Sequence, residues 1–142
     1  MKNKNQKMHV VTVDMGYGHQ RAAYPLASVS TGGVINANQY KGISKKEERS
    51  WQEGRRWYEV ISRFKKVPIL GTIAFAVMDN FQKIEPFYPR RDLSKTSSQQ
   101  RYFYKKVKQG LGRDLINALN KKPAPLVTTF FVPAYFAEYY NY

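Results

Sequence analysis

The chain has 142 residues, 42% of them hydrophobic, which is typical of one folded domain with a substantial core. Cysteine is absent, which excludes disulfides and thiolate catalysis, and with only two histidines no metal site is expected. Lysine and arginine number 24 against 10 aspartates and glutamates, so the formal net charge of +14 predicts attraction to nucleic acid, anionic lipid or phosphorylated substrates.

The first seven residues are polar and basic, and we expect them to be disordered ahead of a single domain over 8–142. A short strand follows them, where a secretory signal would have an apolar segment and a small-residue cleavage site. The sequence therefore predicts a cytoplasmic protein.

The most informative pattern is a buried strand that leads into a glycine turn and a histidine, Met8 to His19. Gly16 and Gly18 allow a ligand to approach the backbone closely. His19 falls in the first turn of the next helix, where the helix dipole favours the neutral imidazole, the form that acts as a general base. A histidine in such a turn is also common as a purely structural residue, so both interpretations stay open.

The turn does not complete a dinucleotide-binding fingerprint, because Arg21 stands where the third glycine is required. Asp14 precedes the turn, and no acidic residue ends a clear second strand about twenty residues further on. The sequence therefore argues against NAD and predicts no cofactor for this chain.

The next predicted elements are a helix, a turn, a short strand and a second helix, over 20–30, 31–33, 34–38 and 45–66. Pro25 is expected to end or bend the first of these helices. The second helix places three large apolar side chains on one face, which predicts a contribution to the core. They are Trp57, Ile61 and Phe64.

An apolar helix is predicted over 69–84, too short to cross a bilayer, which needs about 20 residues. It is therefore either a buried core helix or a helix that lies in a membrane interface. The loop after it carries aromatic rings beside arginines, namely Phe87, Tyr88, Arg90 and Arg91. Such a loop suits contact with lipid headgroups or another anion, and equally suits a solvated loop packed on its own prolines.

A long helix is predicted over 96–120, capped by Thr96 or Ser97 and weakened in its middle by Gly110 and Gly112. A strand over 126–131 and a final helix over 134–142 follow. This order predicts an α/β fold with a Rossmann-like parallel sheet covered by helices on both faces. A doubly wound sheet normally has more strands, so we expect an incomplete part of a larger protein.

Aromatic and basic residues are interleaved between Arg101 and Lys106, a pattern that suits stacking on bases and contact with phosphate. No signature of a sequence-specific nucleic-acid fold accompanies this segment. This alternative therefore predicts only non-specific binding, and no specific nucleic acid is expected as a partner.

The segment from Val13 to Ala23 resembles the opening of the diacylglycerol glycosyltransferases of the monogalactosyldiacylglycerol synthase type. In these enzymes a strand, an aspartate, a glycine-rich turn and a histidine precede a helix. The peptidoglycan lipid N-acetylglucosaminyltransferase carries a related turn, and the segment from Pro125 to Pro133 resembles a later strand of the same domain. The resemblance implies the N-terminal, acceptor-binding domain of a GT-B glycosyltransferase, truncated before the domain that binds the nucleotide sugar.

The resemblance also implies roles for single residues. His19 would take the proton of the acceptor hydroxyl, and Asp14 would support it. The acceptor would lie against the glycine turn and the later strand, at Gly16, Tyr17, Gly18, Thr129 and Phe130. Tyr17 stands where the family has another glycine, which bears on the size of the acceptor pocket.

The implied enzyme is peripheral at the inner face of the membrane. Its partners would be anionic lipid, a lipid acceptor and a UDP-sugar bound by the missing domain. Because a base without a donor transfers nothing, we expect this chain alone to be inactive. The alternative is a catalytically inert, truncated binding domain that kept the fold.

Overall fold

The computed structural model describes residues 7–64, 73, 76–77, 80 and 96–142. Three parallel strands form its sheet, in the order β2-β1-β3. They are β1 (Met8–Thr12), β2 (Ser30–Asn36) and β3 (Leu126–Thr128). Parallel pairing of β1 with both neighbours confirms the predicted α/β, Rossmann-like class.

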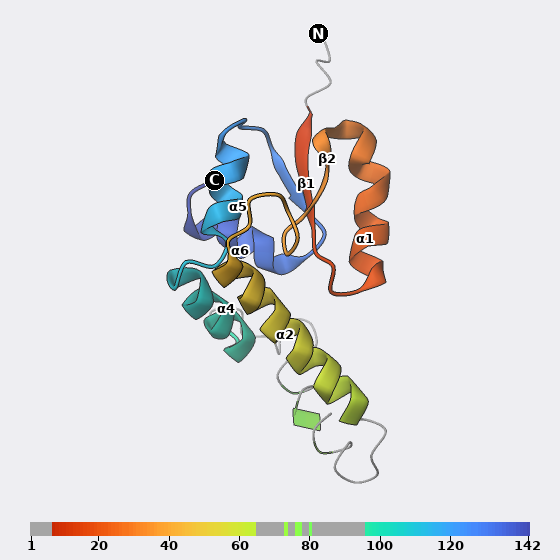
Figure 1. Cartoon of the computed structure of the whole chain (residues 1–142), viewed down its shortest axis with the longest axis vertical. Helices are drawn as coiled ribbons and strands as arrows, with labels where there is room; N and C mark the ends of the chain where they lie inside the picture. The colour runs from red at the N-terminus through yellow and green to blue at the C-terminus, as the bar shows by residue number, and fades with distance from the viewer. Residues whose placement is uncertain (1–6, 65–72, 74–75, 78–79, 81–95) are drawn as a thin grey trace, which may run out of the picture.

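The helices are α1 (Tyr17–Ala23), the 3-10 helix η1 (Tyr24–Val29), α2 (Lys45–Phe64), α4 (Ser98–Lys108), α5 (Arg113–Asn120) and α6 (Phe131–Tyr139). Figure 1 shows α1 on one side of the sheet and α5 and α6 on the other, while α2 and α4 extend away from it. Residues 73, 76–77 and 80 are helical, but the rest of the predicted helix over 69–84 lies outside the described residues. Residues 1–6 of the predicted N-terminal tail also lie outside the described residues.

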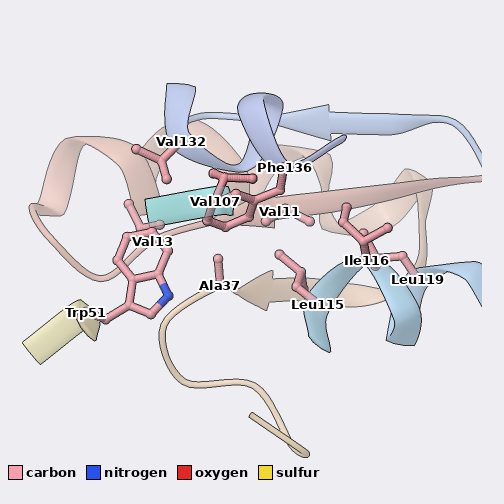
Figure 2. Close-up of a cluster of buried hydrophobic side chains, with 10 residues drawn as sticks. All are labelled: Val11, Val13, Ala37, Trp51, Val107, Leu115, Ile116, Leu119, Val132 and Phe136. Carbon is pink, nitrogen blue, oxygen red and sulfur yellow. The ribbon is translucent and has the colours of Figure 1, made fainter. Parts of the chain in front are cut away.

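The core lies between the sheet and the helices α2, α4, α5 and α6 (Figure 2). Consecutive residues Val10 and Val11 are both fully buried, because helices cover both faces of β1. Trp51 and Phe136 meet edge to face in this core, with ring centroids 6.1 Å apart. Trp51 is thus an anchor of α2 that the predicted apolar face missed; the side chains of that predicted face, Trp57, Ile61 and Phe64, lie outside the described residues.

The turn predicted over 31–33 is wrong, because these residues belong to β2. Met8 pairs with Ser30 and Val10 pairs with Val34, so one residue of β1 stands opposite three of β2, residues 31–33. The Ser30 hydroxyl accepts a hydrogen bond from the backbone N–H of Gly33 at 2.6 Å, which closes this irregularity within the strand. The glycines therefore form a bulge and not a turn between elements.

The single helix predicted over 96–120 is also wrong. Gly110 and Gly112 have left-handed backbone angles, with φ of 105° and 84°, so the chain breaks there into α4 and α5. The predicted cap at Ser97 is confirmed, since its hydroxyl accepts from the backbone N–H of Gln100 at 3.1 Å.

The strand predicted over 126–131 ends earlier, at Thr128. The Thr128 hydroxyl bonds to the backbone of Phe130, which turns the chain out of the sheet. Helix α6 then begins at Phe131, with Pro133 in its first turn, where proline is tolerated.

A buried carboxylate joins α2 to the break between α4 and α5. Glu47 accepts hydrogen bonds from the backbone N–H of Gly112 and from the Tyr40 hydroxyl, the latter at 3.0 Å. Burial raises the pKa of Glu47, and the nearby Asp114 carboxylate adds to the rise, while the two hydrogen bonds oppose it. Burial, followed by the charge of Glu47, also raises the pKa of Tyr40.

We expect the free energy of unfolding to decrease as the pH rises above 4.5, the ordinary value for the Glu47 carboxyl. The native state holds this proton more tightly than the unfolded chain does. The contribution is therefore complete below 4.5 and is lost as the pH rises through the native pKa. Glu47→Gln keeps an acceptor for Gly112 and should flatten this part of the slope. Urea unfolding across roughly pH 4 to 7 measures it.

Glu48→Gln is the matched control, because Glu48 is an exposed neighbour in the same helix. It should keep the pH dependence of the unmodified chain. If both variants change the slope equally, the buried carboxyl is not its source.

Candidate functional site

The carboxyl ends of β1 and β3 meet at one edge of the sheet, as their parallel pairing requires. The turn after β1 brings Asp14, Gly16 and His19 to this edge, and the turn after β3 brings Thr129 and Phe130. His19 and Thr129 are 110 positions apart in the chain yet in contact. In open α/β sheets, ligands bind in the crevice outside this edge.

Two reciprocal hydrogen bonds join His19 to Thr129. The imidazole Nδ1 lies 2.9 Å from the Thr129 carbonyl oxygen, and because a carbonyl only accepts, Nδ1 carries the proton. The Thr129 hydroxyl lies 3.0 Å from the His19 carbonyl oxygen and donates to it for the same reason. The Thr12 hydroxyl, 2.9 Å away, then donates to the Thr129 hydroxyl.

This arrangement fixes one tautomer of the imidazole. With the proton on Nδ1, the neutral ring presents the lone pair of Nε2 as an acceptor. Within the described part of the chain, Nε2 has no hydrogen-bond partner. The Phe130 ring packs against the imidazole with centroids 4.9 Å apart and planes at 69°, which limits its rotation. His19 is thus an oriented base at the open edge of the sheet.

Asp14 is held by amides and an arginine. One carboxylate oxygen accepts from Gln20 Nε2 at 3.1 Å, and the other accepts from Gln39 Nε2 at 3.2 Å. Arg55, which reaches in from α2, lies 3.8 Å from that second oxygen. Both side chains of this ion pair are substantially exposed, so we assign it little stabilisation.

The predicted support of His19 by Asp14 is not direct. Among the described residues, the only hydrogen bond of the imidazole is the one that Nδ1 donates to the Thr129 carbonyl oxygen. Asp14 contacts helix α1 through Gln20, the neighbour of His19. A role for Asp14 in orienting the histidine stays a prediction, to be carried by that helix.

The glycine turn is open to solvent. Gly16, Tyr17 and Gly18 are exposed, and 72% of Tyr17 is accessible. The Tyr17 ring faces the Arg21 guanidinium at 5.5 Å. A Cβ at Gly18 would meet nothing within 4 Å, and one at Gly16 would make only an ordinary contact, 4.0 Å from His19 Cδ2. Packing does not require glycine at either position, so the turn leaves room for a ligand.

Several polar residues at this edge were missed by sequence reasoning. Asn38 accepts from the backbone N–H of Asp14 at 3.0 Å and donates to its carbonyl oxygen at 3.2 Å. Asn38 and Gln39 lie in the turn that follows the end of the second strand at Asn36, so their position at its carboxyl end is the signal that points to them. Arg55 and Thr12 carry no comparable signal, because one comes from a distant helix and the other lies within a buried strand.

Among the described residues we also examined possible metal ligands, membrane-spanning helices and surface hollows. No group of three or more metal-ligating side chains occurs among them. None of their helices combines the length and apolar character needed to cross a membrane. A surface hollow of about 670 Å³ along β3 is lined by neither His19 nor Asp14. The predicted contacts at Phe87, Tyr88, Arg90 and Arg91 lie outside the described part of the chain.

Comparison with models of known protein families, with curated proteins and with solved structures gave no match. What the site does is therefore inferred from its own chemistry. It combines an oriented imidazole, a carboxylate held by amides and an open glycine turn.

Proposed function

We propose that this chain is the acceptor-binding domain of a membrane-associated glycosyltransferase of GT-B architecture, with His19 as the base. The observation that carries the proposal is the fixed tautomer of His19, which turns Nε2 into an acceptor at the open edge of the sheet. A sugar acceptor hydroxyl is a poor nucleophile until such a group takes its proton.

In the proposed reaction the acceptor hydroxyl gives its proton to His19 Nε2 while its oxygen bonds to the anomeric carbon of the donor sugar. The bond from that carbon to the nucleotide diphosphate breaks, and the nucleotide leaves with the electron pair. The Thr129 carbonyl, bonded to Nδ1–H, stabilises the imidazolium that forms. The donor is bound by a second domain, so this chain supplies the acceptor site and the base.

The surroundings of His19 favour an amphipathic acceptor. The Phe130 ring lies on one side of the imidazole and offers an apolar contact. The exposed glycine turn admits a headgroup close to the backbone. A diacylglycerol-like lipid, with one hydroxyl beside apolar chains, matches both features.

A structural histidine would satisfy the same bond to Thr129, so the test must report on Nε2. We expect dihexanoylglycerol to shift the ring resonances of His19 in an NMR titration. Trihexanoylglycerol, whose third hydroxyl is esterified, should leave them unchanged.

The chain holds only two histidines, and His9 serves as the internal control. Its ring is buried and bonded to the Lys122 carbonyl oxygen and the Thr31 hydroxyl. Equal responses to the two lipids, or equal shifts at the two histidines, would contradict the proposal. No response to either lipid would favour the inert binding domain.

A further inference from the structure

A run of aromatic rings leads from His19 to the surface of helix α4. Phe130 contacts Phe131 with centroids 4.5 Å apart, Phe131 contacts Phe103 at 5.3 Å, and Phe103 contacts Tyr102 at 5.5 Å. Helices α4 and α6, which carry most of these rings, pack against each other. We call these four residues the aromatic face. Tyr102 and Phe131 are 48% and 37% exposed, so the face reaches solvent.

Cations border the aromatic face. Helix α4 holds no acidic residue but four basic ones, Arg101, Lys105, Lys106 and Lys108. Lys106 lies over the Tyr102 ring, with its ammonium 5.9 Å from the ring centroid. Within the described part of the chain, the ion pairs are those that Arg55 makes with Asp14 and Glu59. No described carboxylate therefore forms an ion pair with these four cations of α4.

The packing of these rings favours a lipid surface over nucleic acid. Stacking on successive bases requires successive accessible rings. Phe103 instead packs against Phe131, and the Tyr104 hydroxyl donates to the carboxylate of Glu138. Only Tyr102 among the three consecutive aromatics is largely exposed. An exposed phenylalanine beside a tyrosine and lysines is the arrangement that membrane interfaces favour.

We propose that the aromatic face, together with the cations of α4, docks on an anionic lipid surface. The lysines contact the headgroups, and Phe131 and Tyr102 lie at the boundary with the acyl chains. The same face ends at His19, so docking delivers a lipid hydroxyl to the edge of the sheet. The docking stands on the exposed rings and unpaired cations, whereas the delivery to His19 rests on the proposed function.

The test compares two double variants with the same loss of charge. Lys105→Gln with Lys106→Gln removes the cations that neighbour Tyr102 on α4. Arg49→Gln with Arg56→Gln removes two exposed cations of α2. Flotation with vesicles of phosphatidylglycerol and phosphatidylcholine measures the partition of each. Each lost cation should lower the partition constant by about fivefold, so the α4 variant should bind roughly 25-fold more weakly. The partition of the α2 variant should change little.

Two tyrosine variants test the contribution of the exposed aromatic rings to vesicle binding. Tyr102→Ser should weaken partition several-fold, whereas Tyr24→Ser, at a 63% exposed tyrosine on η1, should not. Of the five positions altered on α4 and α2, Lys106 is half-buried and the other four are exposed. Circular dichroism verifies that each variant folds. Equal weakening by the two double variants would show that net charge alone attracts lipid, and would overturn the proposal.

Two further outcomes separate this inference from the proposed function. Tighter binding of single-stranded DNA than of anionic vesicles at the same salt would overturn the lipid partner. His19→Asn should leave vesicle partition unchanged, since the imidazole lies at the inner end of the face. If vesicles bind as expected but dihexanoylglycerol leaves His19 unaffected, the docking stands and the glycosyltransferase proposal fails.

Discussion

Gly112→Ala should destabilise the domain by about 3 kcal/mol or more, through a left-handed backbone conformation and overlap with a neighbouring ring. The backbone φ at Gly112 is 84°, which costs a residue with a Cβ roughly 1–2 kcal/mol. An added Cβ would also overlap the Phe136 ring, which is fully buried in the core of Figure 2. Urea unfolding measures the loss.

Gly110→Ala is the matched control for this variant. Its φ of 105° is also left-handed, but a Cβ there would meet nothing within 4 Å. It should therefore cost only the conformational part, about 1–2 kcal/mol. Equal losses at the two glycines would show that the contact with Phe136 contributes nothing.

A double variant isolates the contact further. Phe136→Leu removes part of the ring that Gly112 faces, so the loss from Gly112→Ala should be smaller in that background. The expected coupling is roughly 1–2 kcal/mol, the share assigned to overlap. Additive losses would place the whole effect in the backbone of the loop.

The same break in the chain shows where sequence reasoning about the fold reaches its limit. The apolar spacing along residues 96–120 predicts a buried stripe of five side chains, namely Tyr104, Val107, Leu111, Leu115 and Leu119. Val107, Leu115 and Leu119 are buried, whereas Tyr104 and Leu111 are only partly buried. A continuous helix over 96–120 was nevertheless wrong, because Glu47 from a distant helix bonds to the N–H of Gly112 and supports the interruption. Periodicity describes a face of a helix, but the left-handed glycines and the long-range bond from Glu47 together set where that helix ends.

The candidate site also has features that the sequence predicts and features that it does not. Parallel strands bring their carboxyl ends to one edge, so the nearness of the His19 turn to Thr129 and Phe130 follows from the strand pattern together with the resemblance. The tautomer of His19 cannot be predicted from the strand pattern, because it depends on which atom of Thr129 faces Nδ1. The ion pair between Asp14 and Arg55 likewise cannot be predicted, because it depends on the path of α2 past the sheet edge.

His19→Asn should greatly reduce the rate of sugar transfer to the acceptor while leaving the fold intact. The asparagine Nδ2 occupies the position of the imidazole Nδ1 and donates to the Thr129 carbonyl in the same way. It has no atom at the position of Nε2, so the base is lost. In an enzyme completed with a donor-binding domain, we expect turnover to fall by about 10²–10⁴-fold. The free energy of unfolding should change by less than about 1 kcal/mol.

His19→Gln keeps an atom near the position of Nε2 but loses the hydrogen bond from Nδ1. It therefore separates the structural role of the imidazole from its catalytic role. The glutamine amide reaches the region of Nε2 but leaves the Thr129 carbonyl without its donor, which costs about 1–3 kcal/mol of stability. Turnover should fall as far as in His19→Asn, because an amide takes no proton at neutral pH. Sugar transfer from a labelled nucleotide sugar to dihexanoylglycerol measures the rates. If His19→Asn keeps its turnover, His19 is a structural residue, and the proton must be taken by another group at this edge.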